Sequence, residues 1–221
     1  MEKVVPSGPA DAKPRKGVFI SFEGIEGTGK TTQAKILAER LSGEGLRVVL
    51  TREPGGTVIG GRIREILLLP EHKEMSHITE LLLYNAARAQ HLAEVILPSV
   101  GDGKVVITDR FTDSTIAYQG YARGLDLGLL GALDRIATGG ARPDLTILFD
   151  LEAEEGLRRN RGVNKVDRFE LEDIEFHRKV REGFLKLAGA EPERIKIVDA
   201  SLPPEEVGKR IWEIVKQSVW L

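Results

Sequence analysis

The chain has 221 residues, enough for one α/β domain with a sizeable core. Its 32 lysines and arginines nearly balance 34 aspartates and glutamates, a formal net charge of −2, so neither nucleic acid nor a membrane is expected as the main partner. The lack of cysteine excludes a disulfide framework, a thiolate nucleophile and a cysteine zinc site, and it suits a cytoplasmic protein.

The first 16 residues are rich in proline and lack the apolar core of a secretory signal peptide. We interpret residues 1–16 as a disordered leader and residues 17–221 as a single domain. No stretch of the sequence approaches the ~20 apolar residues of a membrane span, so we expect a soluble protein.

The stretch from Val18 to Gln33 joins an apolar run to a segment with helical spacing. The loop between them, GIEGTGKT, fits the phosphate-loop pattern G-x-x-x-x-G-K-[ST] in the expected strand–loop–helix context. Glycines let backbone N–H groups turn toward phosphate oxygens at a helix N-terminus. Lys30 would reach the β- and γ-phosphates and Thr31 would bind Mg²⁺. The pattern predicts a site for a nucleoside triphosphate, taken to be ATP, at Gly24, Ile25, Glu26, Gly27, Thr28, Gly29, Lys30 and Thr31.

Short apolar runs alternate with helical patterns along the rest of the chain. We expect strands at 46–50, 104–108, 144–151 and 194–198, helices at 60–69, 78–97, 126–138 and 203–219, and a polar loop at 111–124. Pro98 should end the second of these helices. The alternation predicts an α/β three-layer sandwich with a five-stranded parallel sheet, in which ligands bind beyond the carboxyl ends of the strands.

Three features near the predicted strand ends suggest ligand contacts. Tyr84 and Arg88 lie four residues apart on one helix face, where they could stack on a planar base and bind its edge, although such a pair is usually surface decoration. Asp109 and Arg110 directly follow a strand, and an arginine there can bridge two phosphates. The segment 156–170 favours a basic lid over triphosphate rather than a solvated helix, because it follows a strand and concentrates Arg158, Arg159, Arg161, Lys165 and Arg168.

The ordered set GIEGTGKTTQ, TREPGG, TDRF, STIAYQG and the arginine-rich DRFE segment resembles the thymidylate kinase family over residues 17–215. The resemblance implies a phosphate-loop nucleoside monophosphate kinase fold, transfer of a phosphoryl group from MgATP to dTMP for dTTP synthesis, and a homodimer. Some members have an arginine where this chain has Gly27, and the resemblance therefore implies the subclass with its catalytic arginine in the lid. The implied catalytic residues are Lys30, Arg110, Arg158, Arg159 and Arg161.

The resemblance also implies an acceptor site. Glu26 would lie beside the 3′-hydroxyl of dTMP, Tyr84 would stack on thymine and Arg88 would read the base edge. Arg110 would hold the acceptor phosphate, and Tyr118 would crowd a ribose 2′-hydroxyl. The other implied acceptor contacts are Glu53, Arg64, Ser114, Thr115 and Gln119.

The expected metal is the Mg²⁺ that accompanies ATP. Thr31 would be a direct ligand, and the resemblance implies that Asp109 and Glu170 orient the ion through water. The four histidines have no recognisable metal-ligand spacing, and we expect each at the surface or partly packed.

Two other functions remain open at this stage. One is a kinase on the same scaffold that acts on UMP, CMP or a non-nucleotide alcohol; Glu26, Tyr84 and Arg88 favour a thymine nucleotide only through the resemblance. The other is a non-catalytic ATP-dependent switch that controls a partner. The Asp109–Arg110 pair and the basic segment argue against a switch.

Overall fold

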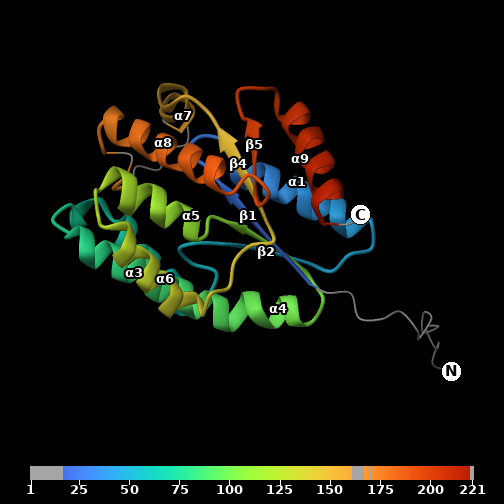
Figure 1. The fold of residues 1–221 in the computed structure, drawn as a ribbon, viewed down its shortest axis with the longest axis horizontal. Helices are drawn as coiled ribbons and strands as arrows, with labels where there is room; N and C mark the ends of the chain where they lie inside the picture. The colour runs from blue at the N-terminus through green and yellow to red at the C-terminus, as the bar shows by residue number, and fades with distance from the viewer. Residues whose placement is uncertain (1–16, 161–166, 170, 220–221) are drawn as a thin grey trace.

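The computed structural model describes residues 17–160, 167–169 and 171–219. The expected leader, the lid residues Arg161 and Lys165 and the metal candidate Glu170 lie outside these ranges. The described residues form a five-stranded sheet with helices on both faces (Figure 1). This arrangement confirms the predicted α/β architecture.

The sheet is parallel and has the strand order β2-β3-β1-β4-β5. Each strand overlaps a predicted one: β1 (Val18–Glu23), β2 (Val48–Arg52), β3 (Val105–Asp109), β4 (Leu145–Asp150) and β5 (Ile195–Asp199). Register places Phe22 of β1 beside Asp109 of β3, and Asp109 beside Arg52 of β2. The loops that follow these three strands therefore meet at one edge of the sheet, where ligands bind in such folds.

Helical segments connect the strands. They are α1 (Lys30–Gly43), α2 (Val58–Leu68), the 3₁₀ turn η1 (Pro70–His72), α3 (His77–His91), the π-helical η2 (Leu92–Ile96), α4 (Leu97–Gly101), α5 (Thr112–Thr115), the π-helical η3 (Ile116–Ala122), α6 (Leu127–Thr138), α7 (Ala153–Asn160), α8 (Ile174–Ala190) and α9 (Pro204–Val219). Among the described residues, no helix is both long enough and apolar enough to cross a membrane.

The side chains of the central strands alternate between two apolar layers, as the period of a strand requires. Ile20 and Phe22 of β1 join the layer beneath α1 and α9. Phe19, between them, packs on the other face with Phe111 and with Leu92 of η2. Figure 1 shows α1 and α9 side by side, on the opposite side of the sheet from α3 and α5. Because both faces are covered, the strands are apolar runs rather than alternating ones.

The prediction that Pro98 ends the helix begun near residue 78 is wrong. The helix passes through η2 and continues as α4 to Gly101. Proline removes one backbone donor, but Pro98 lies in the first turn of α4, where that donor is dispensable, and the wider π-helical turn before it accommodates the change in hydrogen bonding.

Two further segments differ from the prediction. Residues 112–122, expected as a loop, are helical as α5 and η3, because their Ser, Thr and Gln side chains form a buried polar surface rather than a solvated turn. The helix α8 was not predicted, although Phe176, Val180 and Phe184 follow a helical period and Asp173 caps its first turn. α8 packs against η3, which contributes side chains to the site described below.

Candidate active site

A cavity of about 700 Å³ opens at the carboxyl ends of β1, β2 and β3. Residues from the phosphate loop line one side of it, and residues from α2, α3, α5 and η3 line the other. The predicted site residues that line this cavity are Glu26, Gly27, Lys30, Thr31, Glu53, Arg64, Tyr84, Arg88, Asp109, Arg110, Ser114, Thr115, Tyr118 and Gln119.

The phosphate loop wraps around the start of α1. Gly27 and Gly29 have φ values of 72° and 85°, and a Cβ on Gly27 would lie 2.0 Å from the carbonyl oxygen of Gly156. Glycine at position 27 is therefore required by both the backbone conformation and the close approach of α7. Lys30 Nζ donates to the Ile25 carbonyl at 2.5 Å and to Thr28 Oγ1 at 3.1 Å. Burial, reinforced by the charge of Arg110, lowers the pKa of Lys30 to about 8.

Two oxygens suited to a hard cation lie next to this lysine. Thr31 Oγ1 donates to Asp109 Oδ2 at 2.5 Å, across from α1 to the end of β3. Both groups line the cavity, so the predicted pair is adjacent. Within the described ranges, no group of three or more histidine, aspartate or glutamate side chains could hold a metal ion. This donor set suits Mg²⁺ that brings phosphate and water ligands with it.

Arg110 lies between the phosphate loop and the acceptor side. Its backbone has a φ of 75°, uncommon for a residue with a side chain. Its Nη2 donates to Glu26 Oε1 and to the Tyr118 hydroxyl, both at 3.0 Å, while Nη1 donates to Ser114 Oγ at 3.0 Å. The guanidinium is thereby held at the boundary of the two sides of the cavity.

Glu26, the predicted carboxylate of the loop, is also held by His177. The two side chains approach to 3.5 Å from His177 Nδ1 to Glu26 Oε2, and Tyr118 donates to Glu26 Oε1 at 2.5 Å. Burial raises the pKa of Glu26, but the hydrogen bond from His177 and the charge of Arg110 outweigh it and leave the pKa well below the ordinary value. Glu26 is thus an ionised acceptor at neutral pH.

Arg88 is buried, with 1% of its surface exposed, rather than displayed on the helix surface. Its Nε donates to Glu53 Oε2 at 2.8 Å, and Nη2 donates to the Phe111 carbonyl and to Thr115 Oγ1. The other oxygen of Glu53 lies 3.0 Å from Nδ1 of His91. Nη1 of Arg88 is buried and has no hydrogen-bond partner among the residues that the structure describes, so one donor on the cavity wall is left for a ligand.

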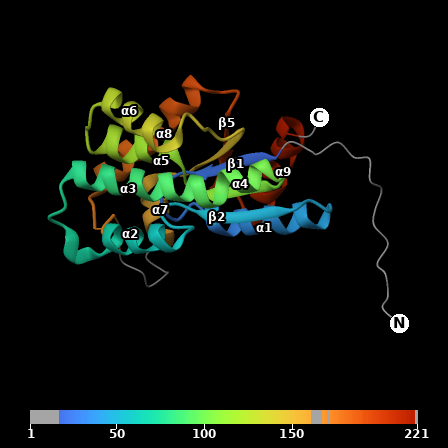
Figure 2. The same cartoon turned by 90° about the horizontal axis from the view of Figure 1, so that it is seen from below.

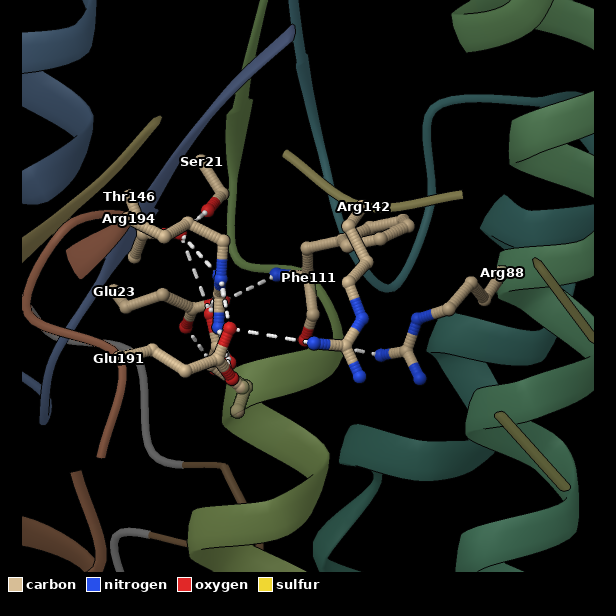
Figure 3. A network of polar contacts seen from close by, with 10 residues as sticks. Ser21, Glu23, Arg88, Phe111, Arg142, Thr146, Glu191 and Arg194 are labelled. Carbon is tan, nitrogen blue, oxygen red and sulfur yellow. Dashed lines mark hydrogen bonds and ion pairs between the residues drawn. The ribbon is translucent and has the colours of Figure 1, made fainter. Parts of the chain in front are cut away.

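A second polar network lies behind this wall (Figure 3). Glu23 at the end of β1 accepts from the Phe111 backbone N–H at 2.7 Å and from Ser114 Oγ at 2.5 Å. Arg194 pairs with Asp113 at 2.7 Å and with Glu191 at 2.9 Å, which ties α5 to the start of β5. Burial, with the nearby charge of Asp113, raises the pKa of Glu23 to about 8. These contacts fix the segment that carries Arg110 and Ser114.

Arg158 and Arg159, the predicted lid arginines that lie within the described ranges, do not line the cavity. Arg158 and Arg159 both pair with Glu155, at 2.7 and 2.8 Å, and Arg159 also donates to the Ala200 carbonyl. Arg168, counted with them in the sequence, is buried instead, where it pairs with Glu80 and donates to the Leu67 carbonyl. It anchors its segment to α2 and α3, which corrects its assignment to a lid charge over triphosphate.

Several polar residues around the site were not identified from the sequence. His91 and His177 are buried with 0% and 1% of their surface exposed, contrary to the expected surface or partly packed positions. Glu23 offered a signal, an acidic residue ending a buried strand beside the phosphate loop. Glu80 and the two histidines carried no local signal, because their partners are distant in the sequence.

Comparisons with a family model, with curated relatives and with solved structures all find thymidylate kinases. The model of the family described as "Thymidylate kinase" matches residues 22–211. The chain is 54% identical over 200 residues to a thymidylate kinase of Syntrophotalea carbinolica, covering 88% of this chain and 93% of that relative. It is 55% identical over 195 residues to the one from Pseudomonas fluorescens, with the same coverage. The crystal structure of thymidylate kinase from Ehrlichia chaffeensis superposes with a TM-score of 0.74 at 36% identity, covering 90% of this chain and 98% of that one.

Proposed function

The chain belongs to the thymidylate kinase family, and we propose that its cavity binds dTMP beside MgATP and aligns the two for phosphoryl transfer. The family match confirms the resemblance drawn from the motifs. The activity of the family is phosphorylation of dTMP in dTTP synthesis. The observation that carries the residue-level proposal is the position of Arg110. It lies between the phosphate loop and the acceptor wall, by which we mean the side of the cavity lined by residues of α2, α3, α5 and η3.

On the donor side, the phosphate loop binds the triphosphate through its backbone N–H groups and Lys30. Lys30 Nζ already lies within the loop, held by the Ile25 carbonyl and Thr28, so it needs only to exchange these acceptors for phosphate oxygens. Binding a polyanion favours the charged amine and opposes the burial that lowers its pKa.

On the acceptor side, Arg110 binds the phosphate of dTMP and neutralises charge on the transferring group. Phosphoryl transfer needs little covalent assistance, so alignment and charge neutralisation supply most of the acceleration. Glu26 accepts from the 3′-hydroxyl, Tyr84 stacks on thymine and the free donor of Arg88 binds the base edge. Glu53 acts through Arg88, because its carboxylate oxygens are engaged by Arg88 and His91.

The metal that fits this donor set is Mg²⁺, held by the Thr31 hydroxyl with Asp109 acting through water. When bound, it neutralises phosphate charge. The role proposed for Arg158, Arg159 and Arg161 is to bring a further positive charge to the triphosphate. Since Arg158 and Arg159 pair with Glu155, that role requires these side chains to exchange partners.

We also propose a homodimer that associates through α2, α3 and α6, with α3 lying between the other two (Figure 2). These three helices carry exposed large apolar side chains: Val58, Ile59, Ile66, Leu82, Leu129 and Ile136. Exposed apolar side chains that gather in a patch commonly mark an interface. Light scattering should give twice the chain mass, and Ile136→Glu should shift it to the monomer mass; a wild-type monomer would refute the dimer.

The proposed compartment is the cytoplasm, which is that of the family. Fractionation of cells that express the protein should recover it with cytoplasmic markers. Recovery with a membrane or an exported fraction would contradict this assignment.

The test of the reaction is ADP release from MgATP by the purified protein, with dTMP, dUMP, UMP, CMP, AMP and GMP supplied separately. Strong preference for dTMP is expected, and release should require Mg²⁺. Preference for UMP or CMP would favour another monophosphate kinase. Equal, negligible release with all six acceptors would overturn the proposal and favour the ATP-dependent switch.

A further inference from the structure

Glu80 is a buried carboxylate beside the cavity that the proposed mechanism does not use. Its side chain is 0% exposed and belongs to α3, one turn before Tyr84 and two turns before Arg88. Oε1 accepts from Gln119 Nε2 at 2.8 Å, and the carboxylate also pairs with Arg168 and Arg123. A buried acid with two guanidinium partners acts as a hydrogen-bond acceptor.

The two helices that form the acceptor wall are joined at two levels. Arg88 Nη2 donates to Thr115 Oγ1 at 2.9 Å, and Gln119 Nε2 donates to Glu80 at 2.8 Å. Residue numbers rise along α3 as they fall along α5 and η3, so the level of Tyr84 lies between the two bonds. A base stacked on Tyr84 would have Arg88 toward one bond and Gln119 toward the other.

The bond to Glu80 fixes the orientation of the Gln119 amide. An amide has a donor end and an acceptor end, and its orientation follows from its hydrogen-bond partners. Because Glu80 accepts, Gln119 turns its NH₂ group toward Glu80. Since Gln119 lines the cavity, the carbonyl oxygen is the end of its amide that remains to accept from a ligand, while Nη1 of Arg88 is a buried donor without a partner among the described residues.

We propose that Glu80 is a positioning residue that sets pyrimidine selectivity by orienting Gln119. The wall then offers one donor and one acceptor, the complement of a ring carbonyl next to a ring N–H. Thymine and uracil carry that pair at positions 4 and 3. Cytosine carries the reverse, an amino group next to an unprotonated nitrogen, and would leave buried polar groups of the site unpaired. This inference rests on the proposed function.

The experiment compares kcat/KM for dUMP and dCMP, which differ only at this edge, in wild type and two Glu80 variants. Glu80→Asp keeps the charge that pairs with Arg123 and Arg168 but withdraws the carboxylate by one methylene. Glu80→Gln keeps the length but can donate, which lets the Gln119 amide reverse. Each variant should lower the ratio of kcat/KM for dUMP to kcat/KM for dCMP by about tenfold or more. The change should come from KM, and kcat for dTMP should stay near its wild-type value.

Glu172→Gln is the matched control, because Glu172 pairs with Arg123 at 2.6 Å in the same cluster, whereas Gln119 donates to Glu80 and not to Glu172. It should leave the ratio within about twofold of wild type. Gln119→Leu should lower the ratio like the Glu80 variants, and adding Glu80→Asp to it should produce no further change. A purely structural role for Glu80 would instead lower thermal stability while the ratio stays constant.

The outcomes separate the two proposals. A wild-type protein that phosphorylates neither dTMP nor dUMP would overturn the proposed function. A wild type that prefers dUMP to dCMP, with the same ratio in Glu80→Asp and Glu80→Gln, would overturn the role of Glu80 alone. If Glu80→Gln does not fold, Glu80→Asp decides, and an unchanged ratio in that variant also overturns the role.

Discussion

The phosphate loop and the acceptor wall face each other across one cavity, but their polar contacts differ in sequence range. Lys30 is bound to groups five and two positions away. Arg88 is bound to groups 35, 23 and 27 positions away, which lie in the turn after β2, just before α5 and on α5. The loop's geometry is thus encoded in one short motif, whereas the wall forms only when several elements have packed.

This difference explains how each side tolerates burial of charge. The loop places its lysine among backbone carbonyls and hydroxyls that belong to the same turn. The wall buries Arg88 at 1% exposure and compensates it with Glu53, which is itself 4% exposed. A buried ion pair is stable only while both partners are present, so the wall should be more sensitive to single substitutions.

Arg110 is the residue at which the two sides join, and its removal should have the largest effect. We expect Arg110→Ala to fold and to lose about 10³-fold or more in kcat, because an arginine on the transferring group contributes on that scale. Arg142→Ala, which removes an exposed arginine paired with Glu191, is the control and should keep wild-type turnover. Near-normal kcat in Arg110→Ala would remove its proposed role.

The difference in sensitivity to substitution between the acceptor wall and the phosphate loop can be measured as a change in the free energy of unfolding, with one substitution on each side. Glu53→Gln leaves Arg88 without its counter-charge and should lower the free energy of unfolding by about 3–5 kcal/mol. Thr28→Val removes a local hydrogen bond to the Ile25 carbonyl and should cost only about 1 kcal/mol. Denaturant titration provides both values, and equal losses would contradict the contrast.

The difference in sequence range between the contacts of the phosphate loop and those of the acceptor wall also determines what could be predicted from the sequence. The phosphate loop and all five strands follow from short patterns, a motif or an apolar run, and they were predicted. The buried state of Arg88 and His91 was not, since it depends on Glu53, which lies in the turn after β2 and is distant from both in the sequence. Helix α8 is a different case, because the helical spacing of Phe176, Val180 and Phe184 and the cap at Asp173 are local signals that could have predicted it.

Polar composition led to a wrong prediction of secondary structure where the polar residues are buried. Residues 112–115 are short and hydroxyl-bearing or acidic, which is typical of a loop, yet all four are buried in α5. Apart from the local bond between Arg110 and Ser114, they bond to residues such as Glu23, Arg88 and Arg194, none of which is close in sequence. Arg168 was misassigned for the same reason, because its partner Glu80 lies on α3, far from it in the sequence.

Glu23 adjoins both regions and should make stability depend on pH. Its folded pKa of about 8 lies above the ordinary 4.5, so the folded state holds a proton that the unfolded state has lost. Stability is therefore greatest below pH 4.5 for this group and decreases as pH rises toward 8, by up to about 1.4 kcal/mol per pH unit. Glu23→Gln cannot titrate and should gain stability relative to wild type, by a few kcal/mol, between pH 5 and pH 8. A difference that does not vary with pH would mean that Glu23 is ionised in the folded protein.

Tyr84 provides the smallest effect and the sharpest test of what the wall does for the base. Its ring lines the cavity and packs near Phe169, with centroids 6.3 Å apart, so it can act as a stacking surface without its hydroxyl. Tyr84→Phe should therefore bind dTMP nearly as well as wild type. Tyr84→Ala should weaken binding by about 1–3 kcal/mol, the value of a base stacked on an aromatic ring, with little change in ATP affinity. Calorimetric titration with each nucleotide separates these cases. Loss of ATP affinity in Tyr84→Ala would mean that the wall and the phosphate loop are coupled. Loss of dTMP affinity in Tyr84→Phe would mean that the hydroxyl, not the ring, makes the contact.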